Sequence, residues 1–381
     1  MEGFIIALFV CMVLALISKY LSIPAIPFYI LAGIVLGKAG LGVVQSDEIS
    51  QFFSEIGLLF LLFFMGLELR LDRMLADPSK LLISGLIGLV VDMGIGFTAA
   101  YLLGFPLIEA FIIGVAFYIT STAIVLTSLI ENRKLMMKEA ELIIWLEVFE
   151  DIVLIVIIAL LSSADKDLLY FFLKIVLALG VMYLIAHHGR EFLVSILDRD
   201  DETPILFTFA AVLTTAALAI LFGIPDTLMV IALGAALATT DPDAFEQHAR
   251  PFKDVFLVMF FVFFGVTIDF ASGVDLYAIA ILCILAVFSK LISGMLIGLT
   301  IYGSALSGLE IWANTISRGE FSIAIAVLYG SAVVGTVIAA LVIVTTLVGS
   351  FMARYSTSMR RGIVSHNRRK ALVRRPHNSG R

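Results

Sequence analysis

Long apolar stretches recur along almost the whole chain, and they restrict the fold more than any other feature. Most of the thirteen stretches are long enough to cross a bilayer, because ~20 residues at 1.5 Å rise span its hydrocarbon core. The composition, 61% hydrophobic and 15% charged, excludes an ordinary soluble domain. The sequence predicts an all-α polytopic membrane protein with about thirteen transmembrane helices. The stretches cover residues 3–20, 22–40, 51–68, 80–104, 107–130, 139–163, 167–188, 203–223, 225–240, 254–269, 275–302, 309–331 and 334–354.

Lys and Arg are distributed unevenly among the predicted loops. With the N-terminus outside, the inner loops hold eleven of these residues, and the outer loops hold only Lys38 and Lys166. The chain after residue 353 adds nine more on the inner side. Positive charge concentrates on cytoplasmic loops, so we expect a plasma-membrane protein with its N-terminus outside and its C-terminus cytoplasmic. Residues 356–381 are basic and poor in apolar residues, which predicts a disordered cytoplasmic tail.

Charged and hydroxyl residues interrupt four of the apolar stretches near their middles. Charges at this depth are costly, so they are rarely retained without a function. Polar breaks in corresponding segments of two halves are typical of inverted repeats with broken helices. If residues 167–188 are a linker, the chain forms two six-helix halves of opposite topology around an ion or proton site. The interrupting residues are Glu150-Asp151, Thr120-Ser121-Thr122, Lys290 and Ser317-Arg318-Gly319-Glu320.

Several motifs, taken together and in their order along the chain, resemble the membrane domain of the second monovalent cation:proton antiporter family. That family includes Kef-type potassium efflux proteins and Nap-type sodium/proton antiporters. The resemblance covers nearly the whole chain up to about residue 355. The motifs, which accompany Asp151, are PAIPFYILAGIVLG at 24–37, EIG at 55–57 with LLFFMGLEL at 61–69, STAIV at 121–125, FFVFFGVTID at 260–269 and SRGEFS at 317–322.

The resemblance implies a sodium/proton antiporter-like fold that assembles as a homodimer. Its transmembrane transport domain covers residues 1–355. The dimerisation part corresponds to about 1–79 and 203–270, and the mobile core to about 80–163 and 275–354. The core would carry one site between the two faces of the membrane. Kef systems also have a cytoplasmic regulatory domain, and no such domain follows in this chain.

The resemblance also assigns roles to the central residues. Asp151 matches the cation-binding aspartate, a carboxylate that can hold either a monovalent cation or a proton. Glu150 takes the place of the Asp found in electrogenic relatives and of the Asn or Gln found in electroneutral ones. Lys290 matches the lysine that pairs with this first acid. The pair is either broken during transport or a permanent structural link.

The remaining polar residues of the site carry weaker expectations. Thr120, Ser121 and Thr122 would complete the ion's shell, or would simply hydrogen-bond to the backbone. Arg318 and Glu320 would neutralise the ends of the half-helices, or would take a direct part in ion coupling.

Glu147 and Asp92 are candidates for a supporting role. Glu147 precedes the acidic pair on the same helical face, and Asp92 would either contact the site or cap a kink. Glu55 and Glu68 near the ends of segment 51–68 are explained by interfacial placement.

The sequence favours a secondary antiporter that exchanges Na⁺ or K⁺ for H⁺ without a cofactor. Three alternatives stay open: a channel-like, ligand-gated K⁺ efflux protein, a regulator that has lost transport, and a bile-acid-type sodium symporter. The midplane Lys290 argues against a continuous pore, and the intact Glu150-Asp151 pair argues against lost transport. The chain contains no nucleotide-binding loop and no nucleophile–base set, so we expect no enzymatic activity and no nucleic-acid partner.

Overall fold

The computed structural model describes residues 2–21, 23–45, 47–69, 78–163, 168–270 and 275–373. Every regular element in these ranges is a helix, as the apolar pattern predicts. Six continuous helical stretches are long and apolar enough to cross a membrane on their own, and shorter apolar helices accompany them. The six are Glu48–Glu68, Pro78–Leu102, Leu107–Glu131, Thr203–Leu221, Leu276–Tyr302 and Ala332–Arg361.

One group of helices, named the scaffold here, comes from the N-terminal part of the chain and from its middle. Within it, α3 packs against α12 and α13, and α2 packs against α13. Gly66 of α3 faces Gly234 of α12, and Gly33 of α2 faces Gly265 of α13. A Cβ atom at any of these positions would lie 2.8–2.9 Å from the facing glycine's Cα, so only glycine permits these close crossings. The scaffold helices are α1 (Glu2–Leu21), α2 (Ile26–Leu36), α3 (Glu48–Glu68), α9 (Leu168–His188), α10 (Arg190–Leu197), α11 (Thr203–Leu221), α12 (Asp226–Leu237) and α13 (Pro242–Thr267).

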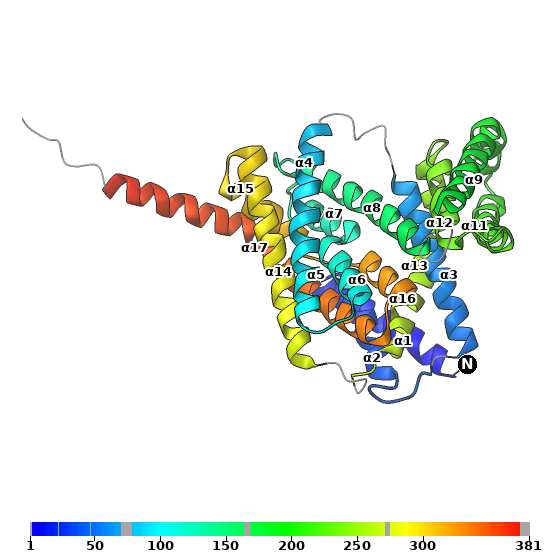
Figure 1. Ribbon diagram of the computed structural model, residues 1–381, viewed down its shortest axis with the longest axis horizontal. Helices are drawn as coiled ribbons and strands as arrows, with labels where there is room; N and C mark the ends of the chain where they lie inside the picture. Colours follow the sequence, from blue (N-terminus) through cyan, green and yellow to red (C-terminus); the bar gives the residue numbers. More distant parts are fainter. Residues whose placement is uncertain are drawn as a thin grey trace, which may run out of the picture.

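The second group, named the core here, comes from the two remaining parts of the chain. In Figure 1, α4, α14 and α15 of the core lie on the opposite side of the bundle from α9 and α11 of the scaffold. The C-terminal part of α17 projects beyond the other helices (Figure 1). The core elements are α4 (Pro78–Gly88), the π-helix η2 (Leu89–Met93), α5 (Gly94–Leu102), α6 (Leu107–Tyr118), α7 (Thr122–Glu131), α8 (Ala140–Ser162), α14 (Leu276–Tyr302), α15 (Ala305–Thr315), α16 (Glu320–Tyr329) and α17 (Ala332–Val373).

Two of the predicted segments are interrupted where their polar motifs lie. Segment 107–130 divides into α6 and α7 around residues 119–121, and segment 309–331 divides into α15 and α16 around residues 316–319. The prediction of a break in each segment is therefore confirmed. Apolar packing from α3 and α13 through α6 to α16 and α17 encloses this region.

The structure differs from the sequence prediction at several helix ends. Helix α10 was not predicted, because eight residues are too few for a spanning segment. Helix α13 begins at Pro242 instead of residue 254, since its first turns are polar and invisible to a hydropathy window. The predicted disordered tail is also not observed up to Val373, because α17 continues to that residue.

Other parts of the prediction remain open. Each of the thirteen predicted stretches overlaps a helix in the described residues, yet thirteen membrane crossings stay a prediction. Lys166, Arg70, Arg73 and the tail beyond residue 373 lie outside the described residues.

Candidate functional site

The two chain breaks meet in the interior of the core. The backbone N–H of Ser121 donates to the carbonyl of Ser317 at 2.9 Å, and the Ser121 hydroxyl donates to Glu320 Oε2 at 2.9 Å. Gly319 permits this approach, because a Cβ atom there would lie 2.3 Å from the Ser121 Cβ. The glycine of the SRGE motif is thus explained by the crossing itself, and Glu320 lies at the positive N-terminal end of α16.

Arg318 holds the carbonyl ends of two half-helices together. Its side chain is fully buried and donates to the carbonyls of Ile316, at 2.6 Å, and Phe117. These carbonyls lie at the C-terminal ends of α15 and α6, where a positive charge is favourable. The hydroxyl of Thr346 in α17 donates to the Arg318 carbonyl at 2.9 Å. The geometry therefore fits the predicted neutralisation of half-helix ends.

Glu150 is held by contacts from α14 and from the break between α6 and α7. Lys290 Nζ of α14 lies 2.8 Å from Glu150 Oε1, and the backbone N–H of Thr120 donates to Oε2 at 2.6 Å. Lys290 also donates to the Tyr118 carbonyl at 2.7 Å and so supplies a hydrogen bond to the C-terminal end of α6. Both Glu150 oxygens are thus engaged, and the expected Glu150–Lys290 pair is present.

Asp92 completes this paired cluster from a third helix. It lies in the π-helix η2 with no solvent exposure, 3.5 Å from Lys290 Nζ. The Ser293 hydroxyl of α14 donates to both Asp92 oxygens at 3.0–3.1 Å. Of the two roles considered for Asp92, contact with the site is the one that the structure supports.

Asp151 follows Glu150 directly in α8, yet its surroundings are different. Its side chain is 2% exposed, and its Oδ1 atom has no hydrogen-bond partner among the described residues. The same holds for both carboxylate oxygens of Glu147 and for the hydroxyls of Thr122 and Ser322 at the starts of α7 and α16. Buried polar atoms are normally hydrogen-bonded, so a group of unpartnered oxygens indicates a place for a ligand.

Four carboxylates lie within electrostatic range of Asp151: Glu68, Glu147, Glu150 and Glu320. Three of them belong to the core, whereas Glu68 lies at the C-terminal end of scaffold helix α3. The sequence analysis explained Glu68 by interfacial placement. No local signal could have linked it to Asp151, because their proximity depends on how scaffold and core pack.

This arrangement suits a monovalent cation better than a tightly bound multivalent metal. In the described part of the chain, no three His, Cys, Asp or Glu side chains form a metal-binding group. The site instead offers unpartnered carboxylate oxygens of Asp151 and Glu147 and the unpartnered hydroxyls of Thr122 and Ser322, and oxygens of this kind are suitable ligands for hard cations. A carboxylate of this kind can hold a cation or a proton.

A second buried polar cluster was missed by the sequence analysis. Lys134, counted there as an inner-loop charge, is 2% exposed. Its Nζ atom lies 3.2 Å from Glu310 of α15, and it donates to the Ala353 carbonyl at 2.6 Å and to the Ser356 hydroxyl, both of α17. Asn314 Oδ1 is a further acceptor at 3.4 Å. A lysine directly after a polar turn gives no sequence signal of burial.

Comparison with known proteins places the chain among transporters. Residues 5–358 match the family described as sodium/hydrogen exchanger, transmembrane. The K(+)/H(+) antiporter subunit KhtU of Bacillus subtilis is 30% identical over 341 residues, covering 84% of this chain and 83% of that protein. The ammonium/H(+) antiporter subunit AmhT of Alkalihalophilus pseudofirmus is 29% identical, with 81% of each chain covered.

The fold has a solved counterpart. The sodium proton antiporter MjNhaP1 of Methanocaldococcus jannaschii superposes with a TM-score of 0.67 at 18% identity, covering 93% of this chain and 95% of that one. The proteins of this family are multi-pass plasma-membrane transporters and not enzymes. The ions that they move are substrates, and they need no cofactor. The match over almost the entire helical region shows that this chain belongs to the transmembrane sodium/hydrogen exchanger family.

Proposed function

We propose that this protein is a secondary antiporter that exchanges a monovalent cation for H⁺, and that cation and proton compete for Asp151. The observation that carries the proposal is the contrast between two adjacent carboxylates. Glu150 uses both oxygens in contacts with Lys290 and Thr120, whereas Asp151 Oδ1 is buried without a partner. An unpaired buried carboxylate is stable only when a proton or a cation neutralises it.

Competition for one carboxylate is sufficient to couple the two ions. A site occupied by the cation releases its proton, and a site that takes up a proton releases its cation. Hydroxyls of Thr122 and Ser322 and backbone oxygens of the breaks would replace part of the ion's water shell. We propose that Thr120 and Ser121 do not bind the ion directly but hold the chain breaks in position, because their polar groups already bond to Glu150 and Glu320.

The two broken segments support an inverted-repeat transport domain that works by alternating access. We propose thirteen crossings, with residues 167–188 as the linker between two six-helix halves. The scaffold without α9 and α10, about residues 1–79 and 203–270, would form the homodimer. The core, about 80–163 and 275–354, would move with the site. The close glycine contacts within the scaffold suit a rigid part of this kind.

The proposed orientation has the N-terminus outside and the C-terminus in the cytoplasm. It rests on the excess of Lys and Arg in the loops assigned to the inner side.

The identity of the cation is a separate matter. The names of the relatives mention potassium and ammonium. The family itself is described as sodium/hydrogen exchanger. We therefore propose a monovalent cation, with Na⁺ and K⁺ as the first to test and ammonium as a third. Glu150 would make the exchange electrogenic only if its contact with Lys290 breaks during the cycle.

Proton flux in proteoliposomes tests the proposal. Na⁺, K⁺ or ammonium is added at several pH values, with and without an imposed membrane potential. The wild-type protein should release protons in response to at least one cation. Asp151→Asn should abolish this response and keep the fold. The matched control substitution Asp198→Asn, at the exposed end of α10, should leave the proton release unchanged. Cation-driven proton release by Asp151→Asn would refute the proposal. A cation flux without proton flux in the wild-type protein would favour the alternative of a channel-like efflux protein.

A further inference from the structure

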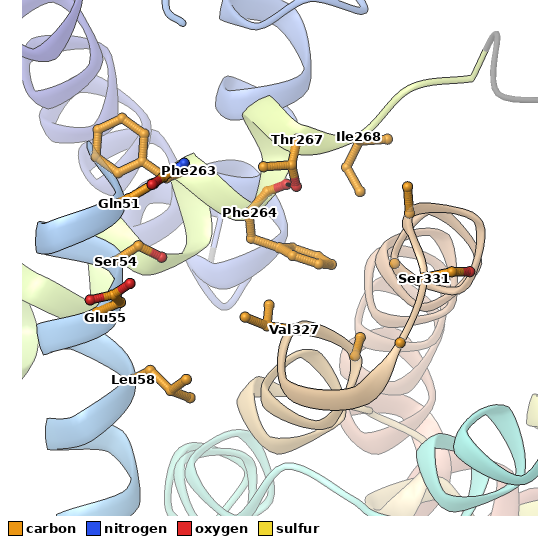
Figure 2. A pocket seen from close by; sticks show the side chains of 14 residues that line it. Gln51, Ser54, Glu55, Leu58, Phe263, Phe264, Thr267, Ile268, Val327 and Ser331 are labelled. Atoms are coloured by element: carbon orange, nitrogen blue, oxygen red, sulfur yellow. Dashed lines mark hydrogen bonds between the residues drawn. The ribbon is translucent and has the colours of Figure 1, made fainter. Parts of the chain in front are cut away.

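A cavity of about 330 Å³ lies between scaffold and core at the face where α3 begins and α13 ends. This face, which also carries the N-terminus, is called the N-terminal face (Figure 1). Figure 2 shows Leu58 of α3, Phe264 of α13 and Val327 of α16 directed into the same space. Gln51, Glu55, Thr267 and Ser331 around it are exposed, so the cavity opens to the surface.

The wall formed by α3 is polar and has free bonding capacity. Gln51, Ser54, Glu55 and Leu58 follow the spacing of one helical face. Among the described residues, the side chains of the first three make no hydrogen bond or ion pair. By contrast, the Thr267 hydroxyl already donates to the Phe264 carbonyl at 2.7 Å.

Glu55 is the one carboxylate in the cavity lining of the described chain. Asp269 lies one residue beyond the lining residue Ile268, and Lys38 at 3.2 Å already balances its charge. The carboxylate of Glu55 has no such cation beside it. The cavity therefore carries an uncompensated negative charge, fixed on the scaffold.

The opposite wall leads toward the crossing. It consists of small residues of α16 and α17, among them Ala326, Gly330, Ala332 and Gly335. Ala326 lies six residues after Glu320 in α16, which corresponds to about 9 Å along the helix. The volume would hold on the order of ten waters at ~30 Å³ each. The cavity thus extends from the N-terminal face to within about two helical turns of the Ser121–Glu320 contact.

We infer that this cavity is the vestibule through which the transported cation enters from the N-terminal face, and that Glu55 is the residue that recruits it. The inference rests on the proposed cation/proton exchange. A fixed charge in a cleft with apolar walls raises the local concentration of counter-ions. Gln51 and Ser54 supply oxygens that replace part of the hydration shell as the ion moves inward. Glu55 acts on entry and not on the competition at Asp151.

The first test compares Glu55→Gln with the wild-type protein in proteoliposomes of known orientation. The half-saturating cation concentration on the N-terminal face should rise about 3- to 10-fold at ~10 mM ionic strength, and the effect should fade at ~1 M salt because the charge is then screened. The maximal rate and the half-saturating concentration on the opposite face should not change. Glu48→Gln, on the same helix but outside the cavity lining, is the matched control.

A second test probes the vestibule without relying on charge. The natural Cys11 and Cys283 are buried, so a new cysteine can be labelled selectively. A membrane-impermeant thiol reagent added to the N-terminal face should label Ser54→Cys and stop exchange. The same reagent should label Glu48→Cys and leave exchange intact.

The outcomes separate this inference from the proposed function. An unchanged half-saturating concentration in Glu55→Gln, or full exchange by labelled Ser54→Cys, would overturn the vestibule even if Asp151→Asn remains inactive. Exchange that survives in Asp151→Asn would overturn the proposed function, whatever Glu55→Gln does.

Discussion

Two buried lysines in this protein illustrate two different uses of charge in a protein interior. Lys290 at the crossing is 3% exposed and lies 2.8 Å from Glu150, and Lys134 is 2% exposed and lies 3.2 Å from Glu310. Each links helices that are far apart in the sequence. Judged by the ion pair alone, the two clusters are alike.

The balance of charge separates them. Lys134 meets one acid, Glu310, and its other partners are neutral acceptors of α15 and α17. At the crossing, two cations, Lys290 and Arg318, accompany five buried acids, so a net charge of about −3 would result if every group were ionised. A balanced cluster can only hold helices together, whereas an unbalanced one must take up protons or cations. The five acids are Asp92, Glu147, Glu150, Asp151 and Glu320.

The largest effect on stability is expected at the balanced cluster. Lys134→Met leaves Glu310 buried without its cation, which should destabilise the protein by about 3–5 kcal/mol. The double variant Lys134→Met/Glu310→Leu should recover most of this loss, because no uncompensated charge remains. Thermal unfolding in detergent measures both. Exchange per folded molecule should stay at the wild-type level, and a change in cation selectivity would show that the cluster takes part in transport.

The contact between the two chain breaks should be the next most sensitive position. Gly319→Ala places a methyl group against Ser121, so the half-helices must separate at a cost of about 1–3 kcal/mol. We also expect slower exchange, since the Ser121–Glu320 hydrogen bond moves with the break. The same substitution at Gly94, where a Cβ would meet nothing within 4 Å, is the control. Equal effects of the two substitutions would argue against a special role for the crossing.

Removal of a complete pair at the crossing sharpens the comparison further. Glu150→Gln combined with Lys290→Gln keeps the net charge around Asp151, so we expect retained exchange, but Asp92 loses its contact with Lys290 and keeps only the Ser293 hydroxyl, which should cost about 1–3 kcal/mol of stability. Lys290→Gln alone makes the site more negative and should impair exchange more than the double variant. Proton flux with and without a membrane potential distinguishes the cases. If the double variant is as inactive as Asp151→Asn, the pair takes part in coupling and is not a permanent structural link.

The smallest effect is expected at the C-terminal extension of α17. Arg360 is 27% exposed and pairs with Glu139 at 3.3 Å, so water screens much of the interaction. Arg360→Ala should cost about 1 kcal/mol or less. Thermal unfolding at low and high salt measures it, and the difference from wild type should shrink at high salt. A loss as large as that of Lys134→Met would mean that Arg360 belongs to the buried cluster.

Local features of the sequence were sufficient for the class of protein and for the positions of the two chain breaks. Apolar length predicted the helices, because every backbone polar group in lipid needs an internal partner. Polar residues in the middle of apolar segments predicted both chain breaks, at Thr120-Ser121 and at Ser317–Gly319, because so few such residues are tolerated there. The family followed from the same motifs.

Only the tertiary structure decided which acid has which partner. Sequence analysis placed Glu150 and Asp151 side by side, but the free Asp151 Oδ1 depends on contacts to its neighbour from α14 and from the break between α6 and α7. Likewise, Lys134 is buried because Glu310 and Ser356 contact it, and these residues lie 176 and 222 positions away in the sequence. Pairing and burial are properties of helices that meet across the fold, and a local pattern contains no information about such distant partners.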